Sequence, residues 1–188
     1  MKINNEKRVF IGIPIGCKIK SILPIVKSAV NCNPNCIKWI PPENIHLTLS
    51  FLGNIKVKDI PHLIESFEKK ITSNDFQFTI TGTGVFPSSK SPKVLWLGIS
   101  TGIYELTLLH IQVEKSVREL KDNYENNIFT PHISIARIRR LHAKIDVLPF
   151  LNSVYSPVEL DVNSICLYES QLFSEGTQYT LLNAFPLN

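Results

Sequence analysis

Two short segments of this chain contain the same pair of side chains that could exchange protons with a substrate. Residues 46–49 read His-Leu-Thr-Leu and residues 132–135 read His-Ile-Ser-Ile. Alternate side chains of a β-strand share a face, so His46 points with Thr48, and His132 points with Ser134. Histidine, with an ordinary pKa of about 6.5, can donate or accept a proton near neutral pH. The repeated pair predicts a two-histidine acid–base site.

The residues around the first pair alternate in polarity, as expected of a strand with one face in the core. One set of alternate positions is polar, namely Asn44, His46, Thr48 and Ser50, and the other is apolar, namely Ile45, Leu47, Leu49 and Phe51. The pattern predicts that the apolar set, Phe51 included, packs in the core. The polar face is then free for chemistry.

The two motifs lie 86 positions apart, and the same offset relates other parts of the chain. Residues 8–13 fall on residues 94–99, both strand-like, with Gly12 on Gly98. Each half has the predicted order strand, helix, strand, helix, strand: helices at 18–30, 57–71, 103–121 and 141–151, and late strands at 76–85 and 158–168. A last strand is expected at 178–185. This pattern predicts one domain, residues 1–188, of two similar halves (8–86 and 94–170) whose histidine strands face each other.

The composition is that of a globular protein without a membrane span. The chain has 188 residues, 44% of them hydrophobic, and no apolar run approaches the roughly 18 residues of a transmembrane helix. The N-terminus lacks the apolar region of a signal peptide, so the cytoplasm is the expected location. The spacing of the four cysteines does not predict a disulfide scaffold or a metal site: Cys17, Cys32, Cys36 and Cys166.

A basic segment follows the second motif, within a chain of net charge +4. It begins with Arg137-Ile138-Arg139-Arg140 and continues to His142 and Lys144, and beside a phosphate site such a segment is typical of phosphate contact. Arg137 is five positions beyond His132, so strict alternation places it on the opposite face. A bulge or a strand end would return it to the histidine face. Arg137 is therefore an expected substrate contact, with a structural ion pair as the alternative.

The sequence resembles the two-histidine phosphoesterase superfamily, and specifically the RNA 2′,3′-cyclic phosphodiesterases, also called 2′-5′ RNA ligases. The matching segments run almost from end to end of the chain: residues 8–13, 39–53, 84–87, 131–137, 167–170 and 185–187. A single His-x-Thr-x sequence is common by chance. Two copies in these surroundings and in this order are specific.

The resemblance implies an α+β, bilobal fold in which two antiparallel sheets with outer helices, related by a pseudo-two-fold duplication, flank a central cleft. It also implies hydrolysis of a 2′,3′-cyclic phosphate at an RNA end to a 2′-phosphomonoester, without metal or cofactor. In this family pattern His46 is the proton donor and His132 the proton acceptor, while Thr48 and Ser134 donate hydrogen bonds to phosphate oxygens. The second motif has serine where threonine is usual, which keeps the hydroxyl. A terminal 5′-hydroxyl replacing water in the reverse reaction would give ATP-independent 2′-5′ ligation.

The other histidines and the aromatic residues have weaker predictions. His62 and His110 fall in expected helices and are interpreted as ordinary surface or partly buried residues, whereas His142 is a candidate RNA contact beside the basic segment. Four aromatic residues could stack on a base, although core packing is the commoner role: Trp39, Phe51, Phe86 and Tyr168.

Three functions remain open at this point. The first is the RNA enzyme, a monomer whose substrates would include transfer-RNA halves. The second is a sister phosphodiesterase that acts on small cyclic nucleotides, ADP-ribose cyclic phosphate or 2′-5′ oligoadenylates. The third, from another class, is a non-catalytic RNA-binding module, which would not need two histidines and two hydroxyls.

Overall fold

The computed structural model describes residues 5–118, 128–139, 145–174 and 176–188, and has the predicted mixture of antiparallel strands and helices. Its strands are β1 (Glu6–Pro14), β2 (Ile37–Trp39), β3 (His46–Lys56), β4 (Phe76–Phe86), β5 (Val94–Thr101), β6 (Ile133–Ile138), β7 (Val158–Val162), β8 (Ser164–Leu172) and β9 (Thr177–Pro186). Its α-helices are α1 (Ile22–Ser28), α2 (Ile60–Lys70), α3 (Ile103–Val117) and α4 (Leu148–Leu151). Short 3-10 turns are η1 (Gly16–Ile19), η2 (Pro34–Cys36), η3 (Pro42–Asn44) and η4 (Val57–Asp59).

The strands pair in the order β7-β4-β5-β6-β3-β1-β8-β9, and β2 adds to β6. Every pairing between these strands is antiparallel. Two strand groups, β7-β4-β5-β6-β2 and β3-β1-β8-β9, meet where β3 and β6 pair through Leu47 and Ile133. These two residues are 86 positions apart, the same spacing as the two histidines that precede them. The expected α+β fold of antiparallel strands with outer helices is confirmed, but within the described residues the two expected sheets are joined through this pair into one nine-stranded sheet.

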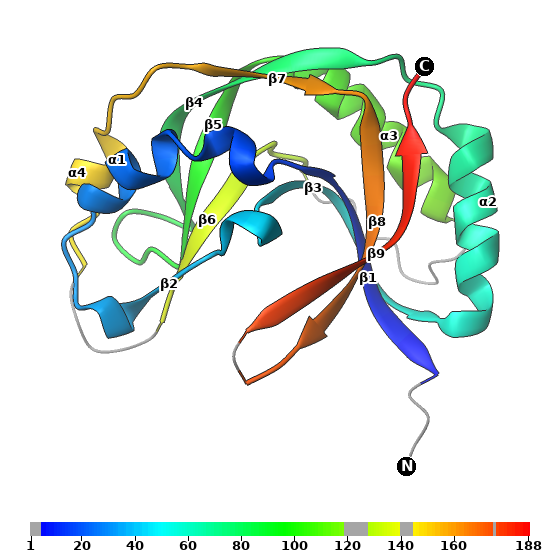
Figure 1. The fold of residues 1–188 in the computed structure, drawn as a ribbon, viewed down its shortest axis with the longest axis horizontal. Coiled ribbons are helices and arrows are strands. Elements are labelled where there is room, and N and C mark those ends of the chain that lie inside the picture. Colours follow the sequence, from blue (N-terminus) through cyan, green and yellow to red (C-terminus); the bar gives the residue numbers. More distant parts are fainter. Residues whose placement is uncertain (1–4, 119–127, 140–144, 175) are drawn as a thin grey trace.

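The helices lie outside the strands, as the sequence predicted. Figure 1 shows α2 and α3 together beside the β3-β1-β8-β9 group, and α1 and α4 at the opposite side of the molecule, near β4 and β5. Helix α3 packs on both β3 and β5, and α2 packs on α3 and β9. Among the described residues, no helix is long and apolar enough to cross a membrane.

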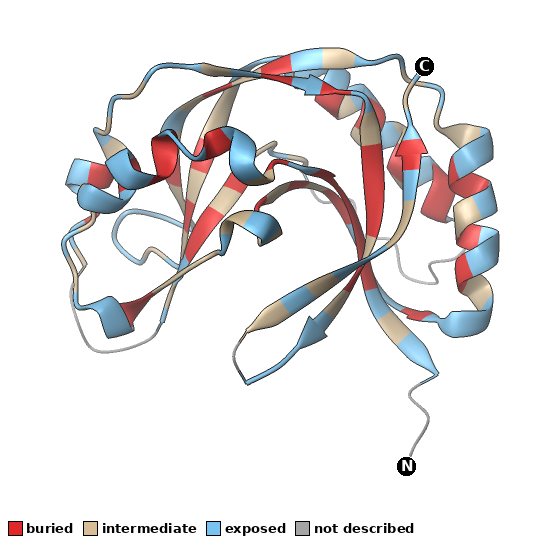
Figure 2. Ribbon diagram, in the orientation of Figure 1, coloured by how far each residue is buried: buried red, intermediate tan, exposed pale blue. Residues whose placement is uncertain are grey.

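The core follows the strands. Buried residues gather where β1, β3 and β8 run together, whereas the far end of the β8-β9 hairpin is exposed (Figure 2). Phe67 of α2 and Phe185 of β9 are both buried and their ring centroids are 5.3 Å apart, which fixes that helix on its sheet. Burial of aromatic side chains of this size contributes a large share of the hydrophobic stabilisation.

Several predicted elements differ in their limits. The strand expected at 158–168 is two strands, β7 and β8, and the helix expected at 141–151 is seen only as α4, with 141–144 outside the described residues. Strand β2 was not predicted, because three residues are too short for a periodic signal. The offset of 86, which aligns Gly12 with Gly98, does not hold for the strand pairing. Gly12 lies opposite Thr48, but Trp96, and not Gly98, lies opposite Ser134.

Candidate active site at the junction of two strands

The junction between β3 and β6 brings the two histidine motifs together. Leu47 and Ile133 face each other in an antiparallel pair and are both fully buried. In an antiparallel pair, the residue before one partner lies next to the residue after the other. His46 therefore lies beside Ser134, and Thr48 lies beside His132. All four of these polar residues are half-buried. One patch of surface therefore contains two imidazoles and two hydroxyls.

The two imidazoles are held by the same local hydrogen bond. His46 Nδ1 lies 2.7 Å from the backbone oxygen of Asn44, and His132 Nδ1 lies 2.8 Å from the backbone oxygen of Thr130. A carbonyl oxygen only accepts, so Nδ1 is the protonated nitrogen in each ring. In each neutral ring Nε2 is then free to accept a proton, and in each charged ring Nε2–H can donate one.

Two aromatic rings contact His46 and contribute to its partial burial. Its ring centroid lies 4.7 Å from that of Phe10 and 5.2 Å from that of Tyr179, and Phe10 also stacks on Tyr168 at 5.2 Å. Burial lowers the pKa of His46, while the hydrogen bond to Asn44 opposes this and the charges of Arg137 and His132 lower the pKa further. The effect of the His132 charge on His46 indicates that the two rings share one electrostatic site.

His132 has its own aromatic neighbours. Its centroid lies 4.9 Å from that of Phe86 and 6.1 Å from that of Trp96, both edge-on. Burial lowers the pKa of His132, the hydrogen bond to Thr130 opposes it, and the charge of Arg137 adds to the lowering. Both histidines are therefore biased toward the neutral form at neutral pH.

A β-bulge returns Arg137 to the histidine face. Trp96 lies opposite Ser134 but Leu95 lies opposite Ala136, so Ile135 is an extra residue in β6. After this bulge Arg137 lies opposite Val94, which shares a strand face with Trp96. The exposed Arg137 side chain thereby lies on the side of the histidines, whose pKa values its charge lowers.

A second bulge overturns the prediction that Phe51 is a core residue. Gly12 lies opposite Thr48 and Ile11 opposite Ser50, so Leu49 is the extra residue in β3. The bulge reverses the alternation, and Ser50 is 6% exposed whereas Phe51 is 62% exposed. Phe51 lies on the same face as Thr48, with its ring centroid 6.1 Å from that of Phe10.

Of the other aromatic and histidine residues considered from the sequence, only some lie near the motif histidines. Phe86 and Tyr168 belong to the aromatic surroundings of His132 and His46 respectively. Trp39 packs against the core with Lys27 Nζ 5.3 Å from its ring centroid. Exposed His62 lies on α2 with its Nδ1 4.0 Å from Glu65, and His142 lies outside the described residues.

Sequence reasoning missed several residues of the site. Phe10 and Tyr179 come from strands distant in sequence, and their places beside His46 depend on the order of the strands. Asn44 contributes twice, since its backbone oxygen accepts from His46 and its Nδ2 donates to the backbone oxygen of Thr177 at 3.0 Å. The only sequence signal for Asn44 was its position on the polar side of the first motif.

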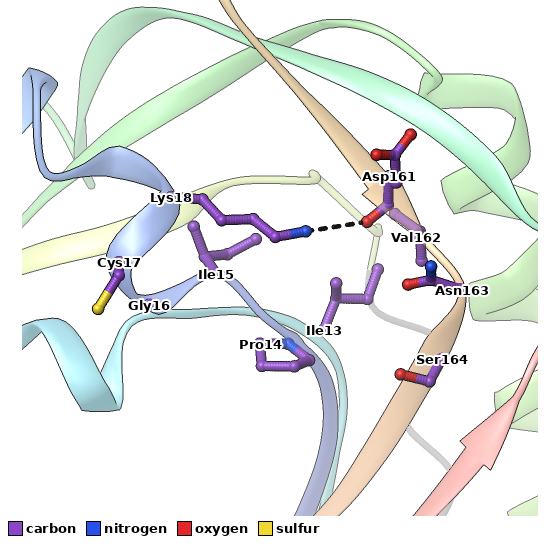
Figure 3. Close-up of a pocket in the computed structure, with 10 residues that line it drawn as sticks. All are labelled: Ile13, Pro14, Ile15, Gly16, Cys17, Lys18, Asp161, Val162, Asn163 and Ser164. Atoms are coloured by element: carbon purple, nitrogen blue, oxygen red, sulfur yellow. Dashed lines mark hydrogen bonds between the residues drawn. The ribbon is translucent and has the colours of Figure 1, made fainter.

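A separate pocket of about 350 Å³ lies where β1 passes into η1. Residues 13–18 and 161–164 line it, and Lys18 Nζ donates to the backbone oxygen of Asp161 at 3.3 Å (Figure 3). Neither motif histidine is among its lining residues. Across the described part of the chain, no three His, Cys, Asp or Glu side chains are grouped as a metal site would require.

The arrangement can perform acid–base chemistry on an anion. Two imidazoles with free Nε2 atoms can act as base and acid, two hydroxyls can donate hydrogen bonds, and Arg137 provides a positive charge that favours a phosphate.

Comparison with known proteins agrees with this geometry. Residues 26–96 match the family model described as LigT like phosphoesterase. The RNA 2′,3′-cyclic phosphodiesterase of Aquifex aeolicus is 34% identical over 187 residues, which is 96% of this chain and 97% of that protein.

Solved structures share the fold. The crystal structure of the protein TT0787 from Thermus thermophilus has a TM-score of 0.78 and 24% identity, covering 96% of this chain and 97% of that one. Escherichia coli LigT in complex with 3′-AMP has a TM-score of 0.76 and 22% identity, covering 97% of this chain and 99% of that one. The extent and identity of the Aquifex match decide the relationship, and the chain belongs to the RNA 2′,3′-cyclic phosphodiesterase family of LigT-like phosphoesterases.

Proposed function

We propose that this protein hydrolyses 2′,3′-cyclic phosphate at RNA ends to a 2′-phosphomonoester. The observation that supports this most directly is the meeting of two imidazoles, each with Nδ1 bonded to the carbonyl two residues earlier, at the junction of β3 and β6. Opening a cyclic phosphate needs a base for water and an acid for the departing ribose oxygen. The family to which the chain belongs gives the substrate class.

In the proposed reaction His132 Nε2 takes a proton from a water molecule as the water oxygen attacks phosphorus. The bond from phosphorus to the ribose O3′ breaks, and His46 Nε2–H gives its proton to O3′. The phosphate stays on O2′, and the two histidines together have moved one proton from water to O3′. Each proton transfer contributes roughly 10² to 10⁴ in rate.

Charge on the phosphoryl oxygens is stabilised by neutral donors and one cation. The Thr48 and Ser134 hydroxyls donate to the non-bridging oxygens, and the Arg137 guanidinium lies on the same face. These groups supply the roles that the reaction requires, so we propose a mechanism without metal or cofactor. Ligation would follow when a terminal 5′-hydroxyl, in place of water, gives its proton to the base and attacks phosphorus, so that the bond to O3′ breaks and a 2′-5′ linkage forms.

The exposed ring of Phe51 gives the substrate a surface for a base. It is 62% exposed and lies on the face of Thr48, where a nucleobase next to the phosphate could stack on it. A solved structure of the same fold, that of Escherichia coli LigT, is described as a complex with 3′-AMP, which supports a nucleotide substrate. The proposal includes a monomeric enzyme in the cytoplasm.

The test compares the wild type with His46→Ala and His132→Ala on an RNA oligonucleotide with a 2′,3′-cyclic phosphate end, in excess chelator. The expected result is hydrolysis by the wild type and at least a 100-fold loss in each variant, roughly the lower limit for one proton-transfer group. His62→Ala, an exposed histidine of α2, is the matched control and should retain activity. Equal turnover in all four proteins would refute the proposal.

The same reactions with small substrates distinguish the sister activity. Adenosine 2′,3′-cyclic phosphate, ADP-ribose cyclic phosphate and 2′-5′ oligoadenylate are separated from their products by chromatography. Turnover of one of these with RNA left intact would assign the protein to the sister class. Binding of RNA without turnover of any substrate would favour the non-catalytic module.

A further inference from the structure

His110 of α3 contacts the last residue of the first histidine motif and the segment that leads into the second, although sequence reasoning gave it no role. Its Nδ1 lies 2.8 Å from the backbone oxygen of Leu49, one residue after Thr48. Its ring stacks on Phe129 with centroids 4.3 Å apart and planes 7° from parallel. Phe129 precedes Thr130, whose backbone oxygen accepts the hydrogen bond from His132. The imidazole of His110 therefore contacts both β3, at Leu49, and the segment before β6, at Phe129.

The contact with Leu49 satisfies a need that the bulge creates. An extra residue in a strand has no opposite partner, and its carbonyl must find a donor elsewhere. At the corresponding bulge in β6, the backbone oxygen of Ile135 accepts from the backbone nitrogen of Ile40 at 2.9 Å. At Leu49 the donor is a side chain, that of His110. The backbone oxygen of the extra residue in this bulge thus accepts a hydrogen bond from a helix side chain.

The stack on Phe129 supports the second motif. Between Phe129 and His132 stand only Thr130 and Pro131, and proline restricts its own backbone angle. Nearly parallel aromatic rings at this separation attract each other, so the stack favours this position of Phe129. The Thr130 carbonyl that orients His132 is consequently tied to α3.

We propose that His110 is a positioning residue that fixes the two motifs relative to each other. Its kinetic consequence rests on the proposed function, because the motifs hold the acid, the base and the phosphate donors. His110 moves no proton in the reaction. Small misplacement of reacting groups can reduce a rate by about 100-fold, so the effect on kcat should be large for a residue outside the chemistry.

Two substitutions separate the contacts of His110. His110→Phe keeps an aromatic ring for the stack and removes the donor to Leu49. His110→Asn places an amide donor near the position of Nδ1 and removes the stack. His110→Ala removes both. Val113→Ala on the same helix, where Val113 is fully buried, is the control for a general loss of stability.

The deciding measurement is the pH titration of the His46 and His132 rings by NMR, which needs no substrate. Loss of the stack should release His132 toward solvent and raise its titration midpoint in His110→Ala and His110→Asn, because burial lowers it in the wild type. His110→Phe and Val113→Ala should leave that midpoint unchanged. Unchanged midpoints in all variants would overturn the inference.

Kinetics then measure the effect on the reaction. With an RNA cyclic-phosphate end, we expect kcat to fall about 10- to 100-fold in His110→Ala and less in each partial variant, with KM nearly constant. If His110→Ala and Val113→Ala have the same Tm and the same loss of kcat, His110 has a merely structural role and the proposal is refuted. A wild type without turnover would refute the proposed function alone, since the ring titrations still decide the role of His110.

Discussion

Phe51 and Arg137 occupy matching positions on the two strands that meet at the junction. Each lies two residues beyond an extra strand residue, Phe51 opposite Phe10 in β1 and Arg137 opposite Val94 in β5. Both side chains are exposed on the face of the histidines. The site therefore has an aromatic ring on one side and a cation on the other, which suits a base and a phosphate of one nucleotide.

Replacement of the exposed ring should weaken substrate binding without unfolding the protein. In Phe51→Ala we expect KM for an RNA cyclic-phosphate end to rise about 10-fold, since stacking on one base contributes roughly 1–3 kcal/mol. The Tm should change little, because the side chain is already 62% exposed. Steady-state kinetics and thermal unfolding check both expectations. Val154→Ala, at 88% exposed in the loop before β7, is the matched control, and equal KM values in the two variants would exclude stacking.

The pH profile should lie on the acidic side of an ordinary histidine. Burial and the charge of Arg137 lower the pKa of both His46 and His132. One ring must be protonated and the other neutral, so kcat/KM should form a bell with its maximum below about pH 6.5. Its two limbs belong to the pair of histidines jointly.

The substitution Arg137→Gln gives the sign of the charge effect. Removal of a positive neighbour favours the protonated form of each ring, so both limbs should move to higher pH. The measurement is kcat/KM as a function of pH, across roughly the range in which imidazoles titrate. The pH of the maximum can be compared even if Arg137→Gln also lowers kcat/KM at every pH. A profile that keeps its position, or moves to lower pH, would show that Arg137 does not act on the histidines.

A change of leaving group should distinguish acid from base. In a cyclic substrate with sulfur at the 3′ position, the departing thiolate needs much less protonation than an alkoxide. The loss of kcat in His46→Ala should therefore be much smaller with this substrate, whereas His132→Ala should stay impaired. Single-turnover rates with both substrates give the comparison. The reverse pattern would exchange the two roles.

Addition of one methyl group at Gly84 should disturb His132 through the ring of Trp96. A Cβ there would clash with the ring of Trp96, so the ring would have to move. Trp96 contacts both Phe86 and His132, so Gly84→Ala should lower stability by about 1–3 kcal/mol and reduce kcat. Denaturant unfolding and kinetics measure the two effects.

The pair with Trp96→Phe tests the cause of that loss. A smaller ring makes room for the methyl group, so the double variant should be more stable than the sum of the two single effects predicts. Strict additivity would place the strain elsewhere.

The sequence predicted the elements and the chemical groups of the site better than their orientation. Alternation in polarity identified the strands of His46 and His132, and the common offset predicted that they meet. A bulge was only one of the ways considered to return Arg137 to the histidine face, and the positions of the bulges, at Leu49 and Ile135, could not be predicted because nothing in the sequence marks either residue as extra. Strict alternation therefore placed Phe51 in the core, which is wrong.

The contribution of distant strands was equally hidden. Tyr179 lies beside His46 only because β9 follows β8 at the end of the β3-β1-β8-β9 group, and no local pattern around Tyr179 indicates this. The role of His110 depends on which turn of α3 packs against the Leu49 bulge. Helical periodicity identifies a buried face but not the backbone atom that it meets.

The pair Leu47 and Ile133, which joins β3 to β6, forms a pivot directly beside the two motif histidines. In any rotation about a point, displacement grows with distance from that point. A small change in angle between the two strand groups at this pair would move His46 and His132 least, and would move the far end of the β8-β9 hairpin most. The spacing of the two imidazoles would then stay nearly constant while the end of the hairpin changes its distance from them.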